Sequence, residues 1–88
     1  MSSLHDLKTW PEFFAQVLTK TKTFEIRRDD RTPEFALGDQ LLLREWDPKD
    51  ERFTGRSAIV RVTSILRGEV PGLQEGYIAM SFELEWSS

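Results

Sequence analysis

Cysteine is absent from the 88-residue sequence, and histidine occurs once, at position 5. The absence of cysteine excludes disulfide bonds and thiolate metal ligands, and it is compatible with a reducing cytosol. A single histidine cannot supply the paired imidazole ligands of a typical zinc site. We therefore expect no metal and no other cofactor, and we expect His5 to lie at the surface or at the end of a strand.

Several sequence motifs are also missing. The five glycines stand singly at separate turns, so there is no glycine-rich phosphate loop, and no Gly-x-Ser-x-Gly motif is present. No apolar run approaches the roughly 18 residues of a membrane span, and the N-terminus lacks the basic and apolar regions of a signal peptide. These absences predict a cytoplasmic protein with no membrane partner.

The net charge of the chain is small, but the charged residues are unevenly distributed along the sequence. A net charge of −3 argues against non-specific binding to duplex nucleic acid, for which a strongly basic domain is typical. Residues 20–31 nevertheless hold five basic and three acidic residues, whereas residues 68–88 hold four carboxylates and no basic residue. This distribution predicts a polarised surface with its basic part centred on residues 20–31.

A helix is expected near the N-terminus. Thr9 is the predicted N-cap, Glu12 closes a capping box, and a proline in the first turn is compatible with both. The helix should span residues 10–19 and bury one apolar stripe. The stripe consists of Trp10, Phe13, Phe14, Val17 and Leu18. We assign Trp10 and Trp86 structural roles because both lie on apolar stripes.

The length allows a single domain that spans residues 1–88. Alternating apolar residues and turn signals predict the remaining elements. Strands are expected at residues 5–8, 23–28, 40–46, 57–66 and 77–86, with a hairpin tip at 53–56 and a loop at 68–76. We therefore expect an α+β fold, a curled mixed sheet or small β-barrel of about five strands with an N-terminal helix.

The strand Lys22–Arg27 is the main candidate for a functional element. Alternation places Phe24 and Ile26 on one face, which we assign to the core, and the polar side chains on the other face. Glu25, Arg27 and the ammonium at the start of the strand can present acceptors and donors to a flat polar ligand, such as a nucleobase, or to a phosphate. The alternative is an ion-pair ladder on an exposed face, worth about 0–1 kcal/mol per pair.

The candidate ligand-binding residues extend beyond this strand. They are Lys20, Lys22, Thr23, Glu25, Arg27, Arg31, Trp46 and Tyr77. Lys20 and Arg31 belong to the basic cluster and are candidates for phosphate contacts. Trp46 offers a ring face on which a base can stack. Tyr77 begins the last strand, from which its hydroxyl could reach a cleft.

Taken together, these residues resemble a known family, the small phage and bacterial ASCH proteins of PUA-like fold. The resemblance rests on Trp10-Pro11, Phe14, Val17-Leu18, Lys22-Thr23-Phe24-Glu25-Ile26-Arg27, Asp30-Arg31, Gly38-Asp39, Leu43-Arg44-Glu45-Trp46-Asp47, Thr54-Gly55-Arg56, Ile65-Leu66 and Gly76-Tyr77. Its most specific part is the Lys-Thr-x-Glu-x-Arg pattern at residues 22–27, which is similar to the ASCH signature. The resemblance implies a small β-barrel flanked by helices, with the signature at the edge of a cleft proposed to bind RNA.

The resemblance also suggests an enzymatic alternative. One ASCH branch hydrolyses N4-acetylcytidine with a lysine and a threonine of the corresponding stretch. Lys22 matches that lysine, but Glu25 stands where the nucleophilic threonine would be, which favours recognition over catalysis.

Our leading hypothesis is a monomeric module that binds RNA, a nucleotide or a modified nucleoside, with Lys22 and Arg27 on a phosphate or carbonyl oxygen and Glu25 on an amine or ribose hydroxyl. The alternatives are a nucleoside amidohydrolase or ribonuclease that uses Lys22 and Glu25, and a phage module that binds a host protein.

Overall fold

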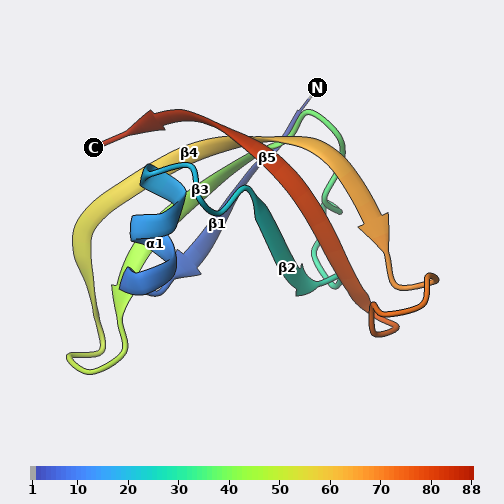
Figure 1. The fold of residues 1–88 in the computed structure, drawn as a ribbon, viewed down its shortest axis with the longest axis horizontal. Coiled ribbons are helices and arrows are strands. Elements are labelled where there is room, and N and C mark those ends of the chain that lie inside the picture. The colour runs from blue at the N-terminus through green and yellow to red at the C-terminus, as the bar shows by residue number, and fades with distance from the viewer. Residues whose placement is uncertain (1) are drawn as a thin grey trace.

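The computed structural model describes residues 2–88, which form one helix and a single sheet of five strands. The elements are β1 (Leu4–Thr9), α1 (Pro11–Leu18), β2 (Phe24–Arg28), β3 (Gln40–Asp47), β4 (Arg52–Arg67) and β5 (Tyr77–Ser87). The strand order is β1-β3-β4-β5-β2, with β1 parallel to β3 and the other neighbours antiparallel. Figure 1 shows β4 and β5 arching over α1. The predicted curled mixed sheet with one helix is confirmed.

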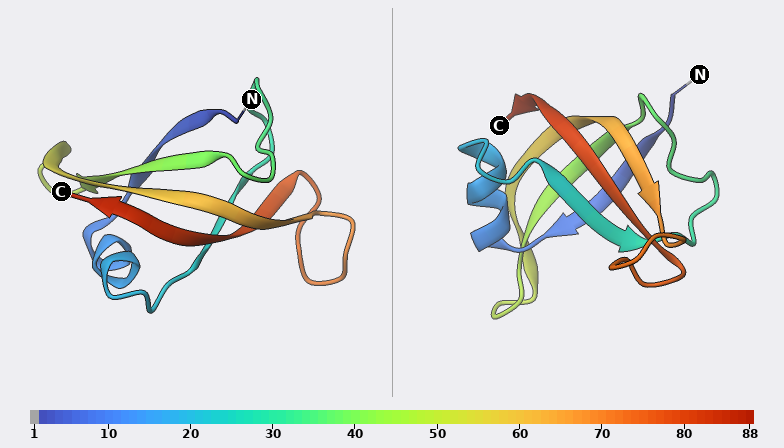
Figure 2. Two further views of the ribbon diagram at one scale, coloured as in Figure 1. Left: turned by 90° about the horizontal axis from the view of Figure 1, so that it is seen from above. Right: turned by 45° about the vertical axis from the view of Figure 1, so that its right-hand side comes forward.

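The curvature of the sheet arises largely in β4, which is 16 residues long. Its pairing with β5 is irregular at two places, between Ile59 and Val60 and between Val62 and Ser64. An extra residue on one strand bends that strand and increases its twist. The sheet therefore curls into a half-barrel, and α1 lies at one of its open sides (Figure 2).

The core fills the concave side of this half-barrel. Its buried apolar residues include Leu7, Val17, Phe35, Leu41, Leu43, Val60, Val62, Ile78, Met80 and Phe82. On β3 and β5 they alternate with half-buried residues, as expected for strands with one face on the core. Burial of each such side chain contributes about 1.5–3 kcal/mol, so this cluster is the main source of stability.

The start of α1 differs from the prediction. Thr9 is the last residue of β1, where it pairs with Glu45 of β3, and Trp10 occupies the N-cap position without a side-chain cap. The helix instead begins at Pro11, whose fixed φ suits a first helical position and whose missing N–H needs no partner. The Thr9 cap is therefore wrong, because strand pairing holds this residue in β1. Within residues 2–88, no helix is both long and apolar enough to cross a membrane.

The two faces of β2 are reversed relative to the prediction. Phe24 and Ile26 are 52% and 54% exposed, whereas Glu25 is only 5% exposed. Glu25 pairs with Met80 of β5, a core residue, and so points to the inner side of the sheet. The carboxylate is tolerated there because two cations accompany it, as described below.

The connection between β3 and β4 is also shorter than predicted. Phe53 pairs with Trp46, and Arg52 pairs with Asp47, so residues 53–56 belong to β4 rather than to a hairpin tip. The turn lies at residues 48–51, where Glu51 adopts a φ of 51°. The chain can reverse here because the positive φ matches the twist of a tight hairpin.

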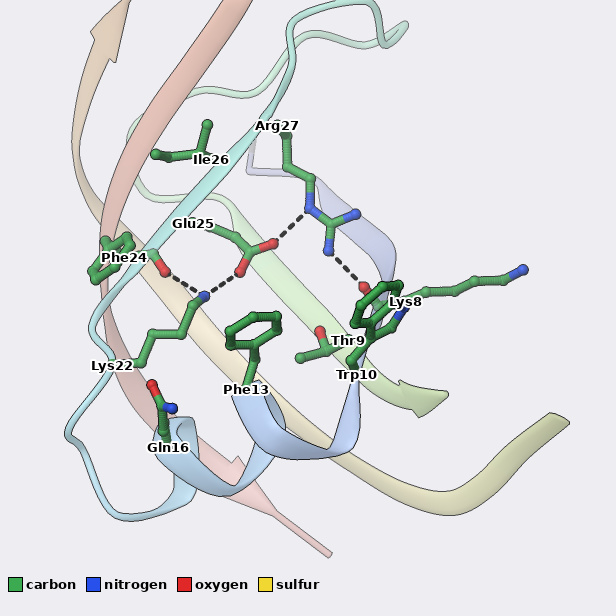
Figure 3. A pocket seen from close by; sticks show the side chains of 10 residues that line it. All are labelled: Lys8, Thr9, Trp10, Phe13, Gln16, Lys22, Phe24, Glu25, Ile26 and Arg27. Atoms are coloured by element: carbon green, nitrogen blue, oxygen red, sulfur yellow. Dashed lines mark hydrogen bonds and ion pairs between the residues drawn. The ribbon is translucent and has the colours of Figure 1, made fainter. Parts of the chain in front are cut away.

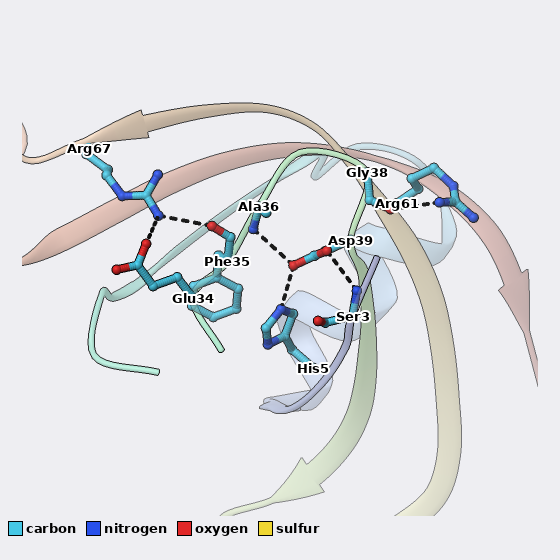
Figure 4. Close-up of polar contacts among 9 residues, drawn as sticks. All are labelled: Ser3, His5, Glu34, Phe35, Ala36, Gly38, Asp39, Arg61 and Arg67. Atoms are coloured by element: carbon cyan, nitrogen blue, oxygen red, sulfur yellow. Dashed lines mark hydrogen bonds and ion pairs between the residues drawn. The ribbon is translucent and has the colours of Figure 1, made fainter. Parts of the chain in front are cut away.

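His5 was expected at the surface or at the end of a strand; it is the second residue of β1 and is buried. Its Nε2 atom lies 2.8 Å from Asp39 Oδ2, and Asp39 also accepts the N–H groups of Ser3 (2.9 Å) and Ala36 (3.0 Å), as Figure 4 shows. Burial disfavours the charged form of Asp39, but these hydrogen bonds outweigh it and hold the pKa of the carboxyl below its ordinary value. The cluster fixes β1 to the segment that leads into β3.

Candidate functional site

A cavity of about 470 Å³ lies between β2 and the junction of β1 with α1. Its walls come from the junction (Lys8, Thr9, Trp10), from α1 (Phe13, Gln16), and from Lys22 together with Phe24, Glu25, Ile26 and Arg27. Figure 3 shows these side chains around the space. The volume falls in the range of roughly 300–1,000 Å³ that is typical of small-molecule sites.

One wall of the cavity is a row of three charged groups. Lys22 Nζ donates to Glu25 Oε1 at 2.6 Å, and Arg27 Nε donates to Glu25 Oε2 at 2.5 Å. Glu25 and Arg27 share the inner face because they are two residues apart on β2, and Lys22 reaches the same place from just before the strand. The carboxylate therefore lies between the two cations (Figure 3), and the row carries a net positive charge.

The two cations keep hydrogen-bonding capacity for a ligand. Lys22 Nζ also donates to Phe24 O (2.7 Å), and Arg27 Nη2 also donates to Lys8 O (2.6 Å). An ammonium has three N–H donors and a guanidinium has five. Within residues 2–88, one donor of Lys22 and three of Arg27 are thus not used, and each oxygen of Glu25 can accept a further bond. The wall combines donors at both ends with an acceptor in the middle.

The opposite wall is aromatic. Trp10 and Phe13 are 50% and 42% exposed, and their rings are nearly parallel, with planes 19° apart and centroids separated by 6.5 Å. Residues three apart in a helix lie on the same side, which brings the two rings together. The predicted burial of the whole α1 stripe is therefore wrong, since only Phe14 and Val17 are buried. Trp86, also assigned to a stripe, is 49% exposed.

A buried hydroxyl completes the cavity. Thr9 is 4% exposed and lines the space, and its Oγ1 atom has no hydrogen-bond partner in the described part of the chain. In Figure 3 this oxygen lies between the rings of Trp10 and Phe13 and points toward the charged wall. Buried polar groups usually have a partner, so this one is unusual.

Only part of the predicted site lies in this cavity. Lys22, Glu25 and Arg27 are brought together there, while Lys20 and Thr23 line an adjacent cavity of about 250 Å³ that also includes Lys22. Residues 2–88 hold no group of three or more histidine, aspartate or glutamate side chains placed to bind a metal ion. The chemistry on offer is charged hydrogen bonding beside an aromatic surface.

Three predicted residues lie elsewhere. Arg31 donates to the backbone carbonyl of Asp6, on β1, at 3.1 Å. Trp46 packs edge-on against Phe53, with ring centroids 4.9 Å apart, and Lys8 Nζ lies 4.0 Å from its ring centre. Tyr77 lines a third cavity at the loop of residues 68–76.

Seven of the ten cavity residues escaped the sequence prediction or were given another role: Lys8 was not a candidate, Phe24 and Ile26 were assigned to the core, and the other four follow. Thr9 was taken as a helix cap, Trp10 and Phe13 as core, and Gln16 was not considered. A usable signal was the placement of two aromatic residues in the first turn of the helix, directly after a strand. There they lie beyond the end of the sheet and can escape burial.

The chain shows two similarities to known proteins. A family model described as "Domain of unknown function (DUF3850)" matches residues 4–82, a range that includes every residue of the cavity. The chain is also 37% identical over 65 residues to an "Uncharacterized 12.9 kDa protein in GpA 3'region" of Escherichia phage P2. That match covers 74% of this chain and 56% of the phage protein, so the chain spans little more than half of its relative's length. The extent of the family match shows that the chain belongs to the DUF3850 family.

Proposed function

We propose that this protein is a PUA-like module of the ASCH type that binds RNA or a nucleotide, with a base or phosphate held in the cavity between β2 and α1. The observation that carries the proposal is the combination of walls in one cavity. A charged row with donors and an acceptor faces two half-exposed aromatic rings. Flat, polar-edged ligands such as nucleobases fit this combination.

Each wall has a separate role in the proposal. Lys22 and Arg27 donate to a carbonyl or phosphate oxygen, and Glu25 accepts from an N–H or hydroxyl group of the ligand. Trp10 and Phe13 provide a stacking surface, which contributes about 1–3 kcal/mol per base in single-strand binders.

The charge of the chain supports single nucleotides or unpaired RNA rather than a duplex. Duplex binders rely on many phosphate contacts and are usually basic, whereas this chain has a net charge of −3. The similarity of residues 22–27 to the ASCH signature supports the same cavity, because all of these residues except Thr23 line it.

Titration with nucleoside 5′-monophosphates and short single-stranded RNA tests the proposal. Replacement of both cations, Lys22→Ala with Arg27→Ala, should weaken binding at least tenfold, because the donors of the charged wall are lost. Lys49→Ala, in the exposed turn between β3 and β4, is the control and should bind like the wild type.

The double variant leaves Glu25 without its cations and can unfold, so Phe13→Ala provides an independent arm. Phe13 is 42% exposed, and its removal takes away stacking while leaving the charged wall intact. Wild-type protein that binds none of these ligands at low salt, or unchanged binding by a folded Phe13→Ala variant and a folded double variant, would contradict the proposal.

The same samples test the enzymatic alternative. Incubation with N4-acetylcytidine and with labelled RNA measures turnover. Turnover that Glu25→Gln abolishes would favour the alternative function, a hydrolase that uses Lys22 and Glu25, over the binding module.

A further inference from the structure

The charged wall of the cavity has a fixed order of donors and acceptors. Lys22 and Arg27 hold opposite oxygens of Glu25, at 2.6 and 2.5 Å, so the carboxylate cannot exchange places with either cation. Glu25 is 5% exposed and keeps its orientation because both oxygens are bound. Along the row, the order is donor, acceptor, donor.

The bases of RNA differ in the edge that would meet such a row. The edge of uracil presents a carbonyl oxygen, an imide N–H and a second carbonyl oxygen. Cytosine presents two acceptors followed by an amine, guanine presents one acceptor followed by two donors, and adenine presents one acceptor and one amine. Only the uracil edge is complementary to a donor, an acceptor and a donor in that order.

We infer that the cavity selects a uracil-type base, a six-membered cyclic imide, over the other bases of RNA. The imide N–H donates to Glu25, and the two flanking carbonyl oxygens accept from Lys22 and Arg27, which have unused donors. The inference rests on the proposed function and adds the identity of the base to it.

A second, independent feature also indicates a polar ligand in this cavity. The Thr9 hydroxyl is buried and has no protein partner among residues 2–88, yet it points into the same space. It belongs to the β1 end of the cavity, apart from the charged row on β2. A ligand that is held by the charged row and reaches across the cavity can form a hydrogen bond with this hydroxyl through a polar group that the row does not bind.

Calorimetric titration of the wild-type protein with four nucleoside 5′-monophosphates tests the order of donors and acceptors in the charged row without any mutation. Uridine and 5-methyluridine monophosphate keep the imide N–H, 3-methyluridine monophosphate blocks it, and cytidine monophosphate lacks it. The first two should bind with similar affinity, and the other two at least tenfold more weakly, because the ring nitrogen that faces Glu25 carries no hydrogen in either of them. The 5-methyl compound controls for the added methyl group.

Thr9→Val and Thr9→Ser test the hydroxyl. The valine variant should bind uridine monophosphate about five- to tenfold more weakly with no decrease in melting temperature, since no protein hydrogen bond is lost, and the serine variant should restore binding. A merely structural threonine would instead lower the melting temperature.

The outcomes separate the two levels of the argument. Equal affinity for uridine, 3-methyluridine and cytidine monophosphates would overturn the selection of an imide while leaving nucleotide binding in place. Failure of every nucleotide and RNA to bind would overturn the proposed function and this inference with it.

Discussion

Removal of the Glu25 carboxylate should destabilise the fold far more than the loss of a surface ion pair. Glu25 accepts two charge-assisted hydrogen bonds, each worth about 1.5–3 kcal/mol. Arg27 is 30% exposed, so solvent compensates part of its loss, but the Lys22 side chain is only 12% exposed. We therefore expect Glu25→Ala to cost about 3 kcal/mol, the lower end of the range for breaking a buried pair.

The cost can be measured by urea and thermal unfolding followed by circular dichroism. A loss of about 3 kcal/mol corresponds to a decrease of roughly 12–24 °C in melting temperature for a domain of this size. Asp6→Ala is the matched control, because Asp6 forms a single exposed ion pair with Arg44 at 3.3 Å and should contribute about 0–1 kcal/mol. A loss below about 1 kcal/mol for Glu25→Ala, equal to that of the control, would refute the reasoning. It would show that Lys22, Glu25 and Arg27 form an ion-pair ladder like those on exposed surfaces.

Three further predictions concern the scaffold. Because the folded-state pKa of Asp39 lies below the ordinary value of 3.8, its carboxylate stabilises the protein above about pH 4. That contribution should disappear as the pH falls through the folded-state value. The difference in urea stability between wild type and Asp39→Asn should therefore shrink from pH 7 to pH 3, and a constant difference would contradict this. Gly68→Ala should cost about 1–3 kcal/mol, since its Cβ would clash with the Gln74 carbonyl oxygen, and an unchanged melting temperature would show that the loop adapts. Leu43→Ala, in the core, should cost about 2–5 kcal/mol, whereas the 65% exposed Leu37→Ala should stay within about 0.5 kcal/mol; similar losses would argue against the core as described.

Much of the fold was predictable because strand signals are local. The alternation of residues 77–86 and the β-branched run of residues 57–66 predicted β5 and most of β4 correctly. The orientation of β2 was not predictable, because it depends on what lies opposite each face. Phe24 and Ile26 are of the residue types usually found in cores, but Glu25 occupies the inner face of the strand, where two cations stabilise it.

The candidate site was predictable only where one strand supplies it. Lys22, Glu25 and Arg27 were identified together because they are close in sequence and lie on one side of β2. The aromatic wall comes from Phe13 in α1 and from Trp10 just before it, and its proximity to β2 results from the curl of the sheet, which no local pattern encodes. Trp46 was grouped with the site for its ring face and Tyr77 for its place at the start of the last strand, and the structure places both outside the cavity.

The reversed faces of β2 also affect how the chain finds its native pairing. A shift of β2 by one residue against β5 would turn Phe24 and Ile26 toward the core and Glu25 toward solvent. Hydrophobic burial alone favours that competing arrangement by about 1.5–3 kcal/mol for each large apolar side chain. The hydrogen bonds of Glu25 with Lys22 and Arg27, and of Arg27 with the Lys8 carbonyl, form on the inner side of the sheet in the native pairing. The row of Lys22, Glu25 and Arg27 thus favours the native register of β2 over the shifted one. A variant without these charged groups keeps Phe24 and Ile26, whose burial favours the shifted register.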